Sequence, residues 1–314
     1  MHIIEQVHDK LFKETFGSVE IAKDFMNGYL PISIRNIVDL NTLDPQKDSF
    51  INKELQEVFS DLLFKVDINN KEGYIYFLFE HKSYKDKLVI FQLLRYMIEI
   101  WESKMKKQNS GELPVIIPLV IYHDKGEWKI KTKLSDMIEG YDQLPEEVKR
   151  YIPDYEYLIY DLTKYNDEDI KLESVTRIII KIMRDVRYAS KEKVVDIITE
   201  GFTLLDKMIE KDNITHYMES CLRYVLSVRN DIDKDELIQI ADQISVEGSE
   251  LVMTIADKLR QEGKQEGRQE GRQEEIRKVV KNAIVKGMSV EDIIDLTGLT
   301  EKGIDKIRKE MLQQ

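Results

Sequence analysis

The chain has 314 residues, of which 42% are hydrophobic and 34% charged, and a net charge of −12 at pH 7; this length holds one large or two ordinary domains of a soluble, helix-rich protein. Its one cysteine, Cys221, excludes an internal disulfide framework, and we expect it to be a small buried side chain within a helix. The longest apolar run, residues 115–122, is too short to cross a bilayer and no signal peptide is apparent, so we expect a cytoplasmic protein without a membrane partner.

Apolar residues at helical spacing predict one helix over residues 7–29. Residues 37–40 predict a short strand, closed by a turn over residues 41–45. Two further runs, residues 57–68 and 73–82, predict a β-hairpin, because the turn that joins them, residues 69–73, is polar and ends in a glycine.

Residues 87–106 predict an amphipathic helix, because apolar side chains recur at i, i+3, i+4, i+7 and i+8. Residues 115–122 and 155–162 are continuous apolar runs, which are typical of strands buried on both faces. The order helix, strands, helix, strand predicts an α/β domain over residues 1–165, with a mixed sheet flanked by helices.

Strand signals end near residue 168, so residues 166–250 predict an all-helical domain. The periodic segments are residues 170–187, 194–210, 215–228 and 235–244. The function of this region is not legible from the sequence.

Residues 251–275 contain a four-residue repeat, Gln-Glu-Gly-Lys/Arg, three times in succession. On a helix this period places Gly263, Gly267 and Gly271 on one stripe, with acidic and basic stripes on roughly opposite sides. Each interior glycine costs a helix roughly 1 kcal/mol relative to alanine. Two interpretations stay open: a flexible charged linker, or a helix that pairs with a second chain and makes the protein a homo-oligomer through its C-terminal region.

Residues 276–314 predict a small three-helix unit that resembles a helix-turn-helix, with breaks near Gly287 and Gly298. Lys302, Lys306 and Lys309 would lie on its last helix and could read DNA. Acidic residues dilute that basic face, so a structural or oligomerisation cap is the alternative.

The residues that indicate chemistry follow the predicted hairpin strands. Asp61 stands on one strand, and Glu80 and Lys82 end the next, where alternation places both on one face. Two carboxylates suit Mg²⁺, which takes few protein ligands and leaves room for phosphate oxygens and water. A neighbouring lysine can stabilise charge on a phosphate or help activate water. The alternative is a pair of charges where a strand emerges into solvent.

These features, with the segment His8-Asp9-Lys10-Leu11-Phe12-Lys13 and an apolar strand that ends in Tyr122-His123, resemble the Rpn family of recombination-promoting nucleases. That family is also described as YhgA-like transposases and belongs to the PD-(D/E)XK nuclease superfamily. The resemblance covers roughly residues 6–165 and implies a restriction-endonuclease-like fold. Ser60 stands where the superfamily motif has proline.

The resemblance also implies site residues beyond Asp61, Glu80 and Lys82. Gln92 and Tyr96 lie one helical turn apart and resemble the Gln-x-x-x-Tyr element of RecB-like nucleases. Further candidates for substrate contacts or for supporting the site are His8, Asp9, Lys13, His123 and Asp161. For each of these, ordinary structural roles such as capping, internal ion pairs or surface polarity remain the alternative.

We therefore expect a Mg²⁺- or Mn²⁺-dependent DNA endonuclease, acting in recombination, DNA mobility or defence. A dimer would suit the cutting of both DNA strands. The net acidity disfavours non-specific adhesion to DNA, so DNA contacts would have to come from local patches. Two alternatives are a catalytically inactive DNA-binding or regulatory protein on the same fold, and a protein-interaction module without a nucleic-acid role.

Overall fold

The computed structural model describes residues 2–46, 61–80, 88–108, 111–123, 126–168, 170, 172, 174–207, 212–244 and 246–312. The chain forms two compact units, Met1–Met253 and Thr254–Gln314. None of the helices among the described residues combines the length and the apolar character needed to cross a bilayer.

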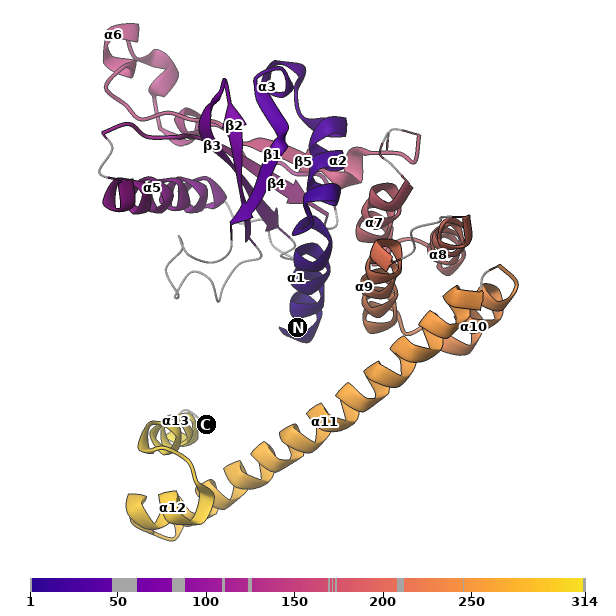
Figure 1. Ribbon diagram of the computed structural model, residues 1–314. Helices are drawn as coiled ribbons and strands as arrows, with labels where there is room; N and C mark the ends of the chain where they lie inside the picture. The colour runs from indigo at the N-terminus through magenta and orange to yellow at the C-terminus, as the bar shows by residue number, and fades with distance from the viewer. Residues whose placement is uncertain are drawn as a thin grey trace. The chain divides into compact units, whose positions relative to one another are not determined.

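A five-stranded mixed sheet forms the centre of the first unit (Figure 1). Its strands are β1 (Val38–Gln46), β2 (Asp61–Ile68), β3 (Lys71–Glu80), β4 (Val115–Tyr122) and β5 (Leu158–Asp161), in that spatial order. β1, β2 and β3 pair antiparallel, whereas β3, β4 and β5 pair parallel. This confirms the predicted α/β class with a mixed sheet.

The hairpin turn between β2 and β3 is tighter than predicted. Asn69 and Asn70 both adopt the left-handed conformation, with φ of 52° and 60°, so two residues close the turn and β3 already begins at Lys71. Asparagine tolerates this conformation better than most residues, and such turns match the twist of a hairpin. Gly73 lies inside β3, where an added Cβ would meet Ile68 Cδ1 at 2.6 Å.

The predicted turn over residues 41–45 is wrong, because β1 continues through it. The register shifts between Asp39 and Asp44, which marks a bulge that absorbs the extra residues. Thr42 Oγ1 holds this bulge to β2 by accepting a hydrogen bond from the Asp67 amide at 2.8 Å. A polar, turn-like sequence therefore remains within the sheet.

Helices cover both faces of the sheet (Figure 1). The predicted helix over residues 7–29 is two helices, α1 (His2–Phe16) and α2 (Val19–Tyr29), and α3 (Ile32–Arg35) follows. The break falls at Gly17, where an added Cβ would lie 2.3 Å from the Lys13 carbonyl oxygen. Phe16 and Phe25 contact Phe77 of β3 and so form the core on this face. α5 (Val89–Gln108) covers the opposite face.

Short helices and four longer ones complete the first unit. They are η1 (Leu134–Met137), η2 (Tyr141–Gln143), α6 (Glu146–Lys149), η3 (Leu162–Lys164), α7 (Ser174–Asp185), α8 (Lys191–Lys207), α9 (Asp212–Val228) and α10 (Lys234–Asp242). Cys221 of α9 is buried as predicted, and burial raises the pKa of its thiol to about 12. All described residues of the helical region belong to the same compact unit as the sheet.

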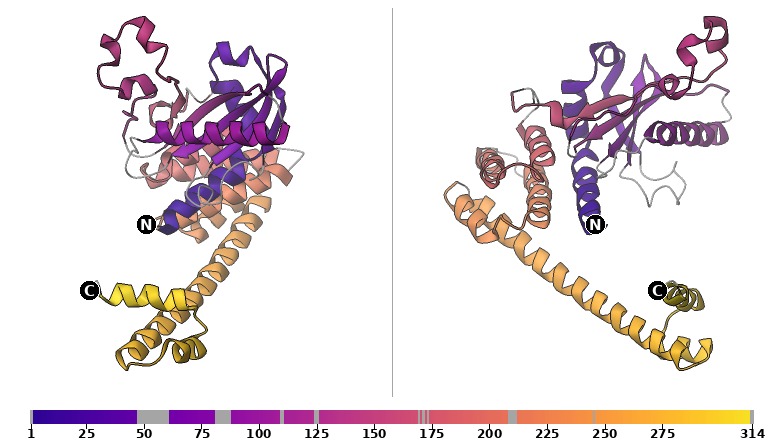
Figure 2. Two further views of the ribbon diagram at one scale, coloured as in Figure 1. Left: turned by 90° about the vertical axis from the view of Figure 1, so that its left-hand side faces the viewer. Right: turned by 180° about the vertical axis from the view of Figure 1, so that it is seen from behind.

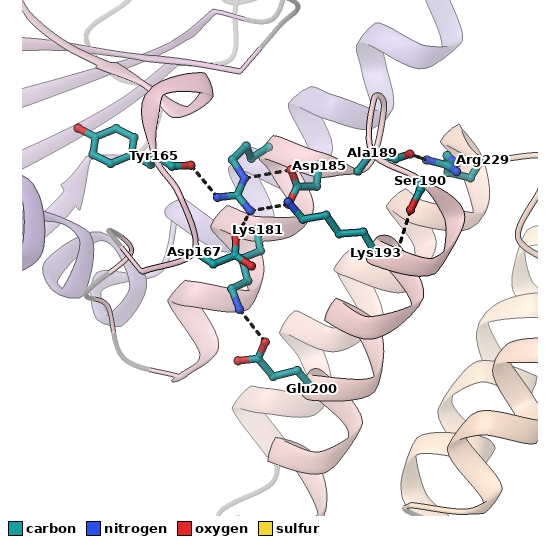
Figure 3. A network of polar contacts seen from close by, with 10 residues as sticks. Tyr165, Asp167, Lys181, Asp185, Ala189, Ser190, Lys193, Glu200 and Arg229 are labelled. Atoms are coloured by element: carbon teal, nitrogen blue, oxygen red, sulfur yellow. Dashed lines mark hydrogen bonds and ion pairs between the residues drawn. The ribbon is translucent and has the colours of Figure 1, made fainter.

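The buried side chain of Arg184 joins α7 to the segment after β5, and Figure 3 labels its partners Tyr165, Asp167 and Asp185. Arg184 donates hydrogen bonds to the Tyr165 carbonyl oxygen at 2.7 Å and to Asp185 at 3.0 Å, and it also pairs with Asp167. Lys193 of α8 reaches the same Asp185 carboxylate at 3.1 Å. These mutually paired charges also line a shallow surface hollow, and they leave little net charge there for an ionic ligand.

The second unit contains the end of α11 (Val246–Val285), α12 (Val290–Thr297) and α13 (Glu301–Leu312). Val280 and Ala283 of α11, Ile293 of α12 and Ile304 of α13 form its core. Ser289 caps α12 by accepting a hydrogen bond from the Asp292 amide at 3.1 Å. The repeat at residues 261–272 is helical and lies within α11, and its pairing with a second chain stays a prediction.

Candidate active site

The backbone register brings Asp61 and Glu80 to one edge and one face of the sheet. Asp61, the first residue of β2, pairs with Leu78 of β3, and Glu80 follows two residues later. Residues two apart on a strand share a face, so Asp61 and Glu80 are diagonal neighbours on adjacent strands. The Cα atoms of such neighbours are about 7–8 Å apart. Only the backbone of these two residues is described, and Lys82 lies outside the described residues.

This shared face is the one that α5 covers. Leu63 follows Asp61 by two residues, Tyr76 pairs with Leu63, and both belong to the core cluster beneath α5. Tyr122, which pairs with Glu80 across β3 and β4, belongs to the same cluster. By register, Asp61 and Glu80 therefore continue the α5 face beyond the end of the apolar core.

Two contacts fix how α5 lies along β3. Lys104 pairs with Glu72 at 2.6 Å near the start of the strand, and the Tyr96 ring lies 5.1 Å from the Tyr76 ring. The eight helical residues between these contacts rise about 12 Å, which matches four strand residues at about 3.3 Å each. One turn earlier on the helix, Gln92 therefore lies about level with Leu78, the residue that pairs with Asp61.

Gln92 has a buried side-chain nitrogen, Nε2. Its Nε2 is shielded from solvent and has no hydrogen-bond partner among the described residues. A buried amide without a partner is uncommon and costs free energy unless a ligand or water completes it. Gln92 therefore holds a buried hydrogen-bond donor about level with the backbone of Leu78.

The structure takes His8 and His123 to the other side of the sheet. Both are buried, and their rings lie 5.0 Å apart between α1 and the end of β4. His123 Nδ1 lies 2.9 Å from the Met183 carbonyl oxygen of α7, and His8 Nδ1 bonds the Tyr224 hydroxyl of α9. These histidines connect the sheet edge to the helical region and do not join the face of Asp61.

Asp161 shares the α5 face, because it pairs with Tyr122. Its carboxylate accepts hydrogen bonds from the Trp128 amide at 2.6 Å and from the Thr163 amide and hydroxyl at 3.1 and 2.6 Å. It lies two strands away from Glu80, which is about 10 Å. Asp161 therefore anchors Trp128 and caps η3, and its backbone lies two strands from that of Glu80.

The remaining predicted residues lie on helices. Asp9 of α1 is half-buried and Lys13, one turn later, is exposed. Lys302 and Lys306 are exposed on α13 of the second unit, and the side chain of Lys309 lies outside the described residues. By backbone position, the structure thus groups Asp61 and Glu80 with Gln92 and Tyr96 on the α5 face. It places His8, Asp9, Lys13, His123, Asp161, Lys302 and Lys306 elsewhere, whereas Lys82 lies outside the described residues.

Sequence reasoning missed the contribution of α9. Tyr217, Ser220 and Tyr224 recur at i, i+3 and i+7; Ser220 and Tyr224 bond side chains of α1, and Tyr217 bonds Ser18, the residue before α2. The Tyr217 hydroxyl reaches Ser18, and the Ser220 hydroxyl reaches Glu14, both at 2.7 Å. A stripe of hydroxyl groups on an otherwise apolar helix face is the signal that could have revealed this contact.

A divalent metal fits the donor set of this edge. Among the residues with described side chains, no three His, Cys, Asp or Glu residues cluster as a metal site. Asp61 and Glu80 are not among those residues, and their register suits two oxygen ligands to one ion.

A comparison with protein families decides the classification. Residues 6–215 match the family model described as "Putative transposase, YhgA-like". The chain belongs to this family. Its relatives in Escherichia coli K12 include the recombination-promoting nuclease RpnA, 26% identical over 94% of each chain, and RpnC, 28% identical over 96% of each. The inactive recombination-promoting nuclease-like protein RpnE is 29% identical over 95% of this chain and 96% of its own. No solved structure matches the chain.

Proposed function

We propose that the protein is a Mg²⁺-dependent endonuclease that hydrolyses DNA phosphodiester bonds. The observation that carries this proposal is the diagonal register of Asp61 and Glu80 on the α5 face, level with Gln92, whose buried Nε2 has no hydrogen-bond partner among the described residues. Relatives named as recombination-promoting nucleases support the reaction class. The order of Asp61, Glu80 and Lys82 along the chain also resembles the PD-(D/E)XK motif.

Each residue has a role in this proposal. Asp61 and Glu80 hold the ion with one carboxylate each, and Mn²⁺ can replace Mg²⁺. When bound, Mg²⁺ supplies charge that polarises the phosphate and lowers the pKa of water. Lys82 stabilises the charge that develops on the phosphate or orients the attacking water. Gln92 donates a hydrogen bond from Nε2 to the phosphate or to that water.

The reaction is a simple hydrolysis. The water oxygen forms a bond to phosphorus while the bond from phosphorus to one sugar oxygen breaks. The products are a phosphate monoester and a hydroxyl group at the nick. We place this activity in the cytoplasm, in recombination, DNA mobility or defence, with DNA as the partner.

A second candidate function is a DNA-binding or regulatory protein that has lost catalysis. The names of two relatives support this second candidate: RpnE of E. coli K12 is named as inactive and YjiP of the same strain as putative inactive. YjiP is 37% identical over 93 residues, which is 30% of this chain. The fold and the α5 face would be the same, and cleavage alone separates the two candidates.

Nicking of a supercoiled plasmid tests the proposal. We expect the wild-type protein to nick with Mg²⁺, and Asp61→Asn and Glu80→Gln to lose at least about 100-fold in rate, since each removes a metal ligand. Asp67→Asn is the matched control, because Asp67 lies on the same strand and face but six residues away, about 20 Å. Equal rates for Asp61→Asn and Asp67→Asn would reject the assigned site, and DNA binding without any cleavage would favour the inactive alternative.

A further inference from the structure

The outer side of α5 exposes large apolar residues. Phe91, Ile98 and Met105 are 47%, 44% and 51% exposed, although α5 packs its other side firmly on the sheet. In the left view of Figure 2, α5 lies in front of the sheet, and no described helix or strand of the first unit crosses over it. An apolar stripe of this kind on a surface helix is typical of a protein interface.

The stripe has a regular period. Phe91, Ile98 and Met105 are spaced by seven residues, so they form one row along the helix. Arg95 and Glu102 form a second row beside it, also seven residues apart, with side chains 70% and 60% exposed. Each makes a loose ion pair within its own helix, Arg95 to Glu99 at 3.8 Å and Glu102 to Lys106 at 3.6 Å. Such exposed pairs contribute little and leave both charges available.

The apolar row and the charged row can each pair with the same row of a second copy that is related by a two-fold axis. When two copies of α5 face each other antiparallel, each row meets its own counterpart. With Ile98 opposite Ile98 of the other copy, Phe91 packs on Met105, and Arg95 lies opposite Glu102, on both sides of the axis. Aromatic–methionine contact and opposite charges are both favourable. In a parallel pair, the apolar row would instead meet the charged row, so only the antiparallel arrangement satisfies both.

We propose that a second copy of this chain docks on the outer face of α5, antiparallel and about a two-fold axis near Ile98. A seven-residue period favours a small crossing angle, roughly 20°. Two helices bury an area at the low end for specific interfaces, so the dimer is reversible, in the micromolar range. This inference does not depend on the nuclease assignment.

The arrangement has a consequence for the candidate active site. α5 carries Gln92 and Tyr96 towards the sheet and presents Ile98 outwards, so the same helix joins two sites across the two-fold axis. The two copies of Gln92 are separated by about 18 Å along the helix direction, since each lies six residues from Ile98. The dimer thus holds two copies of the site in a fixed symmetric relation.

A charge-exchange experiment on the full-length protein tests the interface. We expect sedimentation equilibrium to show a monomer–dimer equilibrium for the wild type. Arg95→Glu and Glu102→Arg should each weaken dimerisation by at least about tenfold, because like charges then meet twice. The double variant Arg95→Glu/Glu102→Arg should restore the wild-type dissociation constant. Ile98→Glu should leave a monomer with unchanged circular dichroism.

Ile32→Glu is the matched control, since Ile32 is 60% exposed on α3, away from the stripe, and it should dimerise as the wild type does. A monomeric wild type throughout the micromolar range would overturn the proposal. So would a dimer that survives Ile98→Glu, which would point to association through residues 251–314 instead. Failure of the double variant to recover would overturn the antiparallel register.

Discussion

Glu72 holds the C-terminal part of α5 against the sheet, and replacing it should lower the free energy of unfolding by a predictable amount. Its carboxylate pairs with Lys104 of α5 at 2.6 Å and with Lys65 of β2 at 2.9 Å, and it accepts a hydrogen bond from the Tyr74 hydroxyl at 3.0 Å. Burial raises the pKa of Glu72, but the hydrogen bonds from Lys104, Lys65 and Tyr74 outweigh this effect and lower the pKa from 4.5 to about 2.

The magnitude follows from linkage between protonation and folding. Lowering a pKa by about 2.5 corresponds to about 3.4 kcal/mol of preference for the charged form in the folded state. The Glu72 side chain is 29% exposed, so solvent screening reduces this contribution, and we expect about 1.5–2 kcal/mol. Because the folded pKa is depressed, this stability is present above pH 4.5 and is lost as the pH falls from about 4.5 towards 2.

Urea unfolding of the wild type and Glu72→Gln at pH 7 and pH 3 measures this contribution. We expect the variant to be about 1.5–2 kcal/mol less stable at pH 7, with the difference shrinking at pH 3. Glu146→Gln is the matched control, because that glutamate is 85% exposed in its pair with Lys149 and should change stability by less than about 0.5 kcal/mol. Equal losses for both variants at pH 7, or a Glu72 difference unchanged at pH 3, would refute the reasoning.

Three further predictions concern the site and its surroundings. Gln92→Leu should keep or raise the melting temperature, because Nε2 has no hydrogen-bond partner among the described residues, yet it should lower the nicking rate at least about tenfold; a lower melting temperature with full activity would contradict this. Tyr224→Phe removes the bond from α9 to His8 and should cost about 1–2 kcal/mol in urea unfolding, and a loss below about 0.5 kcal/mol would show that this contact does not fasten the helical region. Exhaustive chelation should abolish nicking, Mg²⁺ or Mn²⁺ should restore it and Ca²⁺ should not, whereas activity in the presence of a chelator would exclude the metal-dependent mechanism.

The sequence predicted the neighbouring strands of Asp61 and Glu80, but not their register. Register depends on the length of the hairpin turn, and a change of one residue moves every side chain to the other face. Asn69 and Asn70 close the turn alone, which makes Asp61 pair with Leu78 and sets Glu80 as its diagonal neighbour. Gly73 suggested a longer turn. In the structure it lies in β3, where the Ile68 side chain leaves no room for a Cβ, and the sequence does not distinguish such a glycine from a turn glycine.

The meeting of His8 with His123 and Tyr224 was not predictable from local pattern. These residues come from α1, the end of β4 and α9, and their contact depends on how the helical region packs on the sheet. Local periodicity predicted each helix, but it carries no information on which helices become neighbours. Gln92 and Tyr96 were predictable because helical spacing alone places them one turn apart on α5.

The central claim is that Asp61 and Glu80 bind one metal ion. Anomalous diffraction from crystals of the full-length protein with Mn²⁺, in place of Mg²⁺, tests it most directly. The account predicts a single peak within about 2.5 Å of a carboxylate oxygen of both residues, on the face of the sheet that α5 covers. A peak bound to only one of them, or the two carboxylates held apart by separate ion pairs with no metal between them, would contradict it.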